Sequence, residues 1–537
     1  MTARLFTGGR LLRPDPAPAA IDSLAVAGGN IIAVGTEAQC RAALPADAEV
    51  VQLDRAVLAP GFVDTHLHPM VMSVFEQQLV LDSATSIAEV LDAVRDQART
   101  TDAGRAVIGF QLDDARLAER RLPTAAELQA AAGPGRNVVL LRRDGHHAVA
   151  SEAALRAVGF DRPDTIVEGG AVEFDASGVA TGLVRERAVE PLLGLLGDVT
   201  MDDLEAGAAS WSERLLRQGV TAISAMCQTT AEGPSGGAGT FEAVGWSALV
   251  DRLPFDVQTI LITPDVGDVD VYRDTPLHRP GAGRRLDAVK LFLDGTLGGC
   301  TACLHLPSSD HPHTSGLATL DPDEAYRRLE ATHLAGLSAC VHAIGDAANA
   351  RAAELFGRLL AAHPGAHRHR VEHASVLDEA TIQRIAELGL TAVVQPINLH
   401  SEAHWLADRV GAQRLSGTYA FRSLLEAGVR LAGSSDAPIE STDVLAALDA
   451  AVHRPTLAAD QAISGLDALR MYTTAASAVR GTEGRLGSLA VGLQAALVVL
   501  SADPTAVRPA EVHVQRTVIG GIAPFVAQGA CRDPPSH

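Results

Sequence analysis

The segment GFVDTHLH, residues Gly61 to His68, decides the fold that we predict for this chain. It begins as a short apolar run typical of a buried strand and runs into Asp64, His66 and His68. Residues two apart in an extended strand share a face, so the two imidazoles point the same way and can bind one ion. A single His-x-His pair is a weak signal, so the interpretation depends on what the other strands carry.

Further apolar runs of strand length follow, and amphipathic helical patterns separate most of them. The eight predicted strands are Gly61–His66, Ala222–Ala225, Val257–Ile262, Val289–Leu293, Ala339–His342, Arg370–His373, Ala392–Gln395 and Arg430–Gly433. The helical patterns include Pro322–Leu334, Asp346–Ala361 and Ala380–Leu388. Strands that alternate with helices and are continuously apolar are typical of a parallel sheet covered by helices. Eight such strands predict an α/β fold with a closed β/α barrel of the TIM type.

Both ends of the chain instead have the pattern of short strands between glycines and prolines. These strands are Arg4–Phe6, Leu24–Val26 and Ile31–Val34 at the start, and Ala496–Leu500, Val512–Val514 and Thr517–Ile519 at the end. We expect residues 1–58 and 482–537 to form one composite β-sandwich domain. The barrel then comprises residues 59–74 and 201–481, and residues 75–200 form an inserted α+β subdomain with a strand at Val138–Leu141.

Composition excludes several classes of protein. With 47% apolar and 20% charged residues over 537 positions, the chain can form a large core and is not globally disordered. The net charge of −21 argues against nucleic acid or an anionic membrane as a partner. No apolar run reaches the roughly 18 residues of a membrane span, and we expect no signal peptide at the start. Six sparse cysteines exclude a disulfide scaffold, so we expect a cytoplasmic protein.

The basic residues show an unusual bias. Of the 44 lysines and arginines, 43 are arginine, and the single lysine is Lys290. Arginine cannot lose its proton, whereas a buried lysine can, and it can then act as a nucleophile or be carbamylated. The alternative interpretation is chance, because a lone lysine has to lie somewhere. The position of Lys290 in a predicted barrel strand, shortly before Asp294, favours a functional role.

Catalytic groups of a parallel barrel lie at the carboxyl ends of its strands. The predicted strands carry or lead into residues suited to zinc or a similar metal: His66, His68, Lys290, His342, His373 and Asp436. Taken singly, His342 or His373 would be an ordinary core or surface residue, and Asp436 would be a helix cap. Their joint placement, in chain order around a barrel, predicts a metal centre.

Several of these stretches resemble the amidohydrolase superfamily. Within it, they are similar to the branch of the YtcJ-type proteins and the N-substituted formamide deformylases (amidohydrolase family 3). The matching stretches are residues 61–68, 111–114, 143–147, 289–295, 341–346, 370–374, 434–438, 472–473 and 484–489. The resemblance covers nearly the whole chain. It implies a metal-binding barrel with a composite β-sandwich and an inserted domain.

The resemblance also implies a ligand set. His66 and His68 would bind the more buried ion together with Asp436. Lys290, as a carbamate, would bridge two ions, and His342 and His373 would complete the second. A mononuclear site would leave Lys290 as a plain amine. The expected cofactor is a divalent metal, zinc first, as one or two ions.

The sequence departs from the family pattern in two places. The family pattern has a loop that contains serine and arginine, and residues 298–303 stand in its place. They bring Cys300 and Cys303 beside the expected active site. Zinc or redox use of this pair is one interpretation, and a loop that lines the substrate pocket is the other. Residues 495–497 lack the aspartate that is common at this place in the family. We expect its absence to affect packing alone.

The ligand set predicts hydrolysis of a C–N bond in a small amide-like substrate, an N-substituted formamide among the candidates. A metal lowers the pKa of bound water from ~15.7 to about 7, and Asp436 would move the proton to the leaving nitrogen. The predicted catalytic residues are Asp436, Lys290 and His342. The predicted substrate-binding residues are His146, Asp113, Asp294 and Gln395.

Two alternatives keep the same barrel. One is a non-hydrolytic metal-dependent decarboxylase or isomerase, which labelled water would distinguish because only hydrolysis places solvent oxygen in the acid product. The other is a catalytically silent regulatory protein, against which the intact ligand set argues. The substrate, the number of metal ions and the oligomeric state stay open, with a homodimer as one option.

Overall fold

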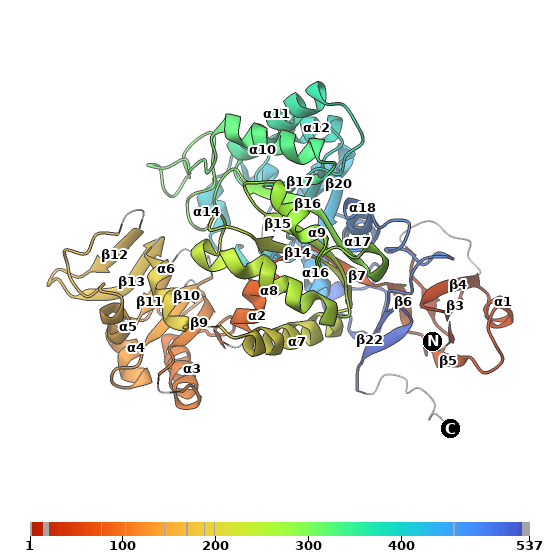
Figure 1. Ribbon diagram of the computed structural model, residues 1–537, viewed down its shortest axis with the longest axis horizontal. Coiled ribbons are helices and arrows are strands. Elements are labelled where there is room, and N and C mark those ends of the chain that lie inside the picture. The colour runs from red at the N-terminus through yellow and green to blue at the C-terminus, as the bar shows by residue number, and fades with distance from the viewer. Residues whose placement is uncertain are drawn as a thin grey trace. The chain divides into compact units, whose positions relative to one another are not determined.

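The computed structural model describes residues 3–13, 21–76, 78–102, 104–114, 116–143, 145, 147–167, 170–186, 188–197, 199–454 and 457–528. The chain divides into two compact units (Figure 1). One unit combines Met1–Pro69 with Ser212–His537, and the other is Met70–Trp211.

The larger unit contains a sheet of eight parallel strands. In chain order these are β7 (Phe62–Leu67), β14 (Val220–Gln228), β15 (Asp256–Ile262), β16 (Arg284–Phe292), β17 (Ser338–Ala343), β18 (Arg370–His373), β19 (Thr391–Val394) and β20 (Arg430–Gly433). Each strand pairs with the next one along the chain, from β7 round to β20. All eight predicted strands are confirmed.

The two outer strands of this sheet meet at their carboxyl ends. The Asp436 amide donates to the His66 carbonyl at 2.8 Å, and the His68 amide donates to the Ala437 carbonyl at 2.8 Å. These bonds bring β20 back to β7, so the sheet is a nearly closed barrel and the predicted β/α barrel is confirmed. The residues that carry out this closure belong to the predicted metal centre.

The barrel strands are buried on both faces, as their continuous apolar sequences predict. All nine residues of β14 are buried, for example. Helices follow the strands, among them α10 (Pro322–Leu334), α11 (Asp346–Ala362) and α12 (Glu379–Glu387), which match the predicted helices. Asp321 caps α10 by accepting from the amides of Asp323 and Glu324, which explains why this helix begins at Pro322.

Two smaller sheets are built from the ends of the chain: the first contains strands from the start alone, and the second combines strands from the start and the end. One has the order β4-β3-β1-β5, and the other has the order β2-β6-β21-β22-β23. Their bounds are β1 (Arg4–Thr7), β2 (Arg10–Leu11), β3 (Ser23–Ala27), β4 (Asn30–Gly35), β5 (Glu49–Gln52), β6 (Val57–Pro60), β21 (Leu497–Leu500), β22 (Val514–Ile519) and β23 (Ile522–Val526). One apolar cluster contains residues of both sheets, including Phe6, Leu24, Leu58, Leu497 and Val518.

The end of the chain differs from the prediction. Val512–Val514 and Thr517–Ile519 are not two strands, because β22 covers Val514–Ile519 as one. The Val512 amide instead donates to the Pro509 carbonyl and closes a short 3-10 turn. A Gly520-Gly521 turn with φ of 58° and 79° then reverses the chain into β23, a strand that the sequence did not predict.

The unit Met70–Trp211 contains its own six-stranded sheet, with the order β12-β13-β11-β10-β9-β8. The bounds are β8 (Leu79–Val80), β9 (Val107–Leu112), β10 (Val138–Arg142), β11 (His147–Ala150), β12 (Gly170–Phe174) and β13 (Ala180–Glu186). Helices α3 (Ile87–Thr100) and α4 (Ala125–Ala132) contribute to its apolar cores. The predicted strand Val138–Leu141 lies within β10, while the predicted domain boundaries stay a prediction.

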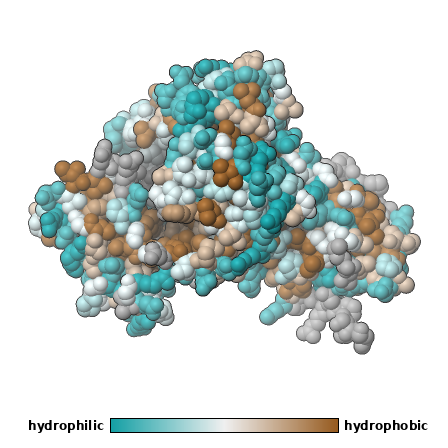
Figure 2. Space-filling model, in the orientation of Figure 1, coloured by the Kyte–Doolittle hydropathy of each residue, from teal (hydrophilic) through white to brown (hydrophobic). Residues whose placement is uncertain are grey.

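No helix among the described residues has both the length and the apolar content that a membrane crossing requires. On the face of the molecule drawn in Figure 2, hydrophilic residues cover much of the surface and apolar residues form patches between them.

Candidate metal centre

The centre of the site is the imidazole of His66, at the carboxyl end of β7. Its Nε2 atom lies 3.2 Å from Oδ1 of Asp436, and Nε2 of His68 lies 3.3 Å from the same oxygen. The two histidines of the His-x-His pair therefore reach one carboxylate, as their spacing on one face of a strand requires.

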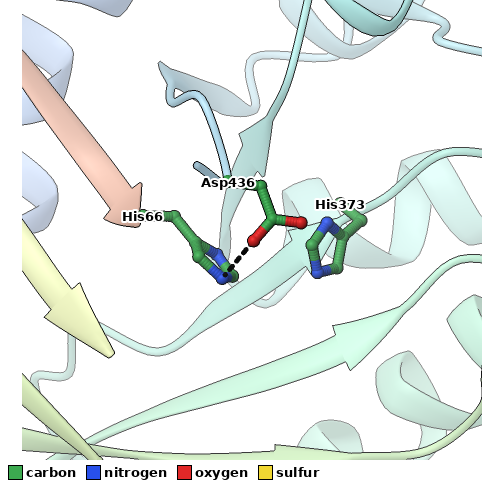
Figure 3. A group of neighbouring side chains, drawn as sticks. All are labelled: His66, His373 and Asp436. Carbon is green, nitrogen blue, oxygen red and sulfur yellow. Dashed lines mark ion pairs between the residues drawn. The ribbon is translucent and has the colours of Figure 1, made fainter. Parts of the chain in front are cut away.

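The other predicted ligands surround this group. Donor atoms of His66, His373 and Asp436 all lie within 4.8 Å of one another (Figure 3). The Lys290 Nζ atom lies 2.9 Å from His66 Nε2. The rings of His342 and His373 lie 4.5 Å apart, centroid to centroid. The structure thus brings together all six side chains that the sequence proposes as the metal centre.

The backbone at the strand ends is unusual. His373 and Asp436 have φ of 72° and 57°, in the left-handed region that residues other than glycine rarely adopt. Along a regular strand Glu372 and His373 would face opposite sides, yet Glu372 bonds His66 and the His373 ring lies 5.1 Å from the His66 ring. The left-handed backbone at His373 allows the side chains of Glu372 and His373 to approach His66 together. Such conformations cost on the order of 1–3 kcal/mol each and are concentrated at functional sites.

Three of the imidazoles have one ring nitrogen held by an oxygen acceptor. These contacts are His66 Nδ1 with Glu372 Oε2 (2.6 Å), His373 Nδ1 with Gln395 Oε1 (3.0 Å) and His342 Nε2 with the Gly295 carbonyl (3.1 Å). An N–H that is donated to such an acceptor fixes the tautomer and leaves the lone pair on the other ring nitrogen. Three such imidazoles beside a carboxylate fit a divalent first-row metal.

The electrostatic surroundings favour the ligand forms of these groups. Burial, followed by the nearby Lys290, holds the pKa of His66 well below its usual range. Burial also lowers the pKa of His342 and of His373, which favours the neutral form that can bind a metal. Burial alone would raise the pKa of Asp436, but the adjacent imidazoles, His66 first, outweigh it and keep this carboxyl ionised.

Lys290 lies in the barrel interior, on β16. It is 1% exposed, and burial lowers the pKa of its amine. Its Nζ atom also lies 4.8 Å from the centroid of the Phe292 ring. The single lysine of the chain is therefore a buried residue in contact with the predicted ligands, and not a solvated surface group.

The four predicted substrate-binding residues lie in different surroundings. Gln395 holds His373 and donates to Ser434 Oγ at 2.8 Å. Asp294 is buried and accepts from the amides of Cys303, Ile344 and Gly345 at 2.9, 3.0 and 2.8 Å. Asp113 is buried after β9 in the unit Met70–Trp211, and His146 lies outside the described residues. Substrate binding by these four residues stays a prediction.

The cysteine pair lies in the loop that Asp294 holds. Cys300 and Cys303 are half-buried, and burial raises the pKa of the Cys303 thiol. The Cys303 backbone donates to Asp294 and packs against Gly345. This loop therefore connects the carboxyl ends of β16 and β17.

Sequence reasoning gave no role to Glu372 and Arg370. The Arg370 Nε group donates to Glu372 Oε1, and its Nη2 group donates to the Thr65 carbonyl at 2.9 Å. A signal was present, because an arginine and a glutamate two residues apart in a buried strand share a face and need partners inside the barrel. The sequence does not indicate which residue they contact, because His66 is 306 residues away from Glu372 in the chain.

The fold and the site together define a class of protein, the metal-dependent hydrolases built on a β/α barrel. Comparison with known proteins agrees with this class. Residues 49–523 match the amidohydrolase family, and the chain belongs to this family. It is 30% identical to the putative amidohydrolase YtcJ of Bacillus subtilis over 88% of this chain and 90% of that one. It is 27% identical to the N-substituted formamide deformylase of Arthrobacter pascens, over 94% and 95% of the two chains.

A solved structure is similar to this chain over nearly its whole length. The crystal structure of an uncharacterized metal-dependent hydrolase from Pyrococcus furiosus is 28% identical and covers 94% of this chain and 100% of that one, with a TM-score of 0.73. The resemblance to the YtcJ and formamide deformylase branch, stated from the motifs, is thereby confirmed.

Proposed function

We propose that this protein hydrolyses a C–N bond in a small amide-like molecule, with N-substituted formamides as the first substrates to test. The observation that carries the proposal is the set of oriented imidazoles around one carboxylate inside the barrel. The substrate class is suggested by the relative from Arthrobacter pascens, which is named an N-substituted formamide deformylase.

We propose zinc, as one or two ions, held by His66, His68, Lys290, His342, His373 and Asp436. A divalent ion at such a site supplies Lewis-acid activation of water and of the substrate carbonyl. Lys290 would contribute as a carbamate: its neutral amine adds to CO2 and loses a proton, and the product has two oxygens that share one negative charge. The burial of the amine against His66 supports this role, which an arginine cannot fill.

Asp436 would move the proton of the reaction. Its carboxylate is ionised, the form that accepts a proton from the attacking water. The same carboxyl group would then deliver that proton to the leaving nitrogen, because an amine leaves poorly unless it is protonated. His66 and His68 both contact Oδ1, so they hold this carboxylate in one position.

The test uses zinc-loaded protein with N-substituted formamides and a wider amide library in 18O-labelled water. We expect release of the amine and appearance of the label in the acid product. Asp436→Asn is the matched control and should release neither. Turnover without label in the product would instead favour the decarboxylase or isomerase, and absence of turnover with every amide would contradict the proposal.

We also propose that the two sheets built from the ends of the chain form one composite β-sandwich. The support is the shared apolar cluster, in which Phe6 and Leu58 are joined by Leu497 and Val518 from the end of the chain.

A further inference from the structure

Glu372 lies between two buried groups in the interior of the barrel. One carboxylate oxygen, Oε2, is 2.6 Å from Nδ1 of His66, and the other, Oε1, accepts from Nε of Arg370. The side chains of His66 and Glu372 are both 0% exposed, and that of Arg370 is 1% exposed. Solvent therefore does not compete for either oxygen.

These contacts cross the barrel. Glu372 and Arg370 are on β18, whereas His66 is on β7, and in the closed order β19 and β20 lie between these two strands. Arg370 Nη2 also donates to the carbonyl of Thr65, the residue before His66, at 2.9 Å. The pair on β18 thus holds both the ring of His66 and the backbone that carries it.

The charges explain why both members of the pair are present. A buried carboxylate without a partner is costly, and the Arg370 guanidinium, which is always charged, offsets that cost. An ionised carboxylate then accepts a stronger hydrogen bond from the His66 Nδ1–H than a neutral acceptor would. A ligating histidine held in this way has a fixed ring and a more basic opposite nitrogen. That nitrogen, Nε2, is the atom facing Asp436 and Lys290.

We propose that Glu372, held by Arg370, is a positioning residue that presents Nε2 of His66 to the metal. Glu372 does not touch the substrate and is not a ligand. The inference rests on the proposed function to the extent that the site binds a divalent ion. Loss of such partners typically lowers metal affinity about 10–100-fold.

The experiment measures binding of Co2+ to the full-length metal-free protein by competition with a chelator, and it records the visible absorption of the bound ion. Glu372→Gln keeps the shape and one acceptor oxygen but removes the charge, and we expect about tenfold weaker binding. Glu372→Leu removes the acceptor, and we expect about 100-fold weaker binding with an altered cobalt spectrum. Should Glu372→Leu fail to fold, Glu372→Gln still gives the answer.

Ser224→Ala is the matched control. Ser224 is buried in the same barrel and donates to Gln258 Oε1 at 2.9 Å, and neither residue belongs to the proposed ligand set. We expect this variant to lose some thermal stability and to bind Co2+ with the affinity and the spectrum of the wild type. A general loss of packing in the barrel would affect all three variants alike.

The outcomes separate this inference from the proposed function. Wild-type Co2+ affinity and spectrum in both Glu372 variants would show a purely structural role and overturn the inference alone. Weakened binding in those variants, with no amide hydrolysed by the metal-loaded wild type, would support the inference and overturn the proposed function alone. A wild-type protein that binds no Co2+ would overturn both.

Discussion

The amine of Lys290 lies 2.9 Å from Nε2 of His66, although 224 residues separate them in the chain. They meet because β16 and β7 lie on different sides of one barrel, with β14 and β15 between them. A lysine at this position reaches the middle of the ligand group. This relationship supports a functional role for the one lysine of the chain.

Lys290→Arg should abolish the proposed carbamate, since a guanidinium stays protonated and does not add to CO2. We expect the variant to bind less zinc per chain and to lose turnover. Incubation with 13C-bicarbonate should give a carbamate NMR signal in the wild type and none in the variant. Equal signals in the two proteins would place the labelled group elsewhere.

Asp436→Ala should lower kcat at least ~100-fold, the lower bound for loss of a general acid–base group. The comparison is made at equal metal content, because Asp436 is also a proposed ligand. Normal turnover of the metal-loaded variant would show that another group moves the proton.

Asp256→Asn tests a buried ion pair away from the metal centre. The carboxylate of Asp256 contacts Arg480 at 2.8 Å and also pairs with Arg485. Burial alone would raise the pKa of Asp256, but the two guanidiniums outweigh it and lower the pKa. Since the folded pKa lies below the unfolded value, the stabilisation is present above about pH 4 and is lost as the pH falls through the folded pKa.

We therefore expect Asp256→Asn to cost about 3–5 kcal/mol at pH 7, because it leaves Arg480 buried without its counter-charge. The difference from the wild type should shrink as the pH falls below about 4. Urea unfolding midpoints across this pH range provide the measurement. Asp251→Asn is the control, because its ion pair with Arg279 is largely solvated and worth less than about 1 kcal/mol. A pH-independent difference for Asp256→Asn would refute this account of the pair.

Gly345→Ala should disturb the loop that carries the cysteine pair. A Cβ atom at Gly345 would lie 2.0 Å from the Cys303 carbonyl oxygen, so the backbone has to move. The movement would pull Cys303 and Gly345 away from Asp294, and we expect a loss of about 1–3 kcal/mol, measured by denaturant unfolding. Gly365→Ala has open space around the new atom and should unfold like the wild type. Equal stability of the two variants would contradict the packing described here.

The barrel was predictable because its strands are buried on both faces and therefore appear in the sequence as continuous apolar runs. The positions of β18 and β20 follow directly from Arg370–His373 and Arg430–Gly433. At the end of the chain the signal was weaker. Apolar residues around Val512 are buried without being in a strand, and the mixed pattern of β23 gave no clear period.

The sequence predicted which residues form the site, but it did not predict the contacts between them. Strand ends in a parallel barrel meet at one edge, so His66, His342 and Asp436 follow from their positions in the chain. The contact between Glu372 and His66 crosses the barrel, and no local pattern encodes it. The orientation of His373 depends on its left-handed backbone, which the alternation of a strand would not predict.

The most direct test of the central claim is the location of the metal. Crystals of the zinc-loaded protein, measured above and below the zinc absorption edge, should give an anomalous peak bounded by the side chains of His66, His373 and Asp436. A peak at another position, or zinc-loaded crystals with no peak between these three side chains, would contradict the account.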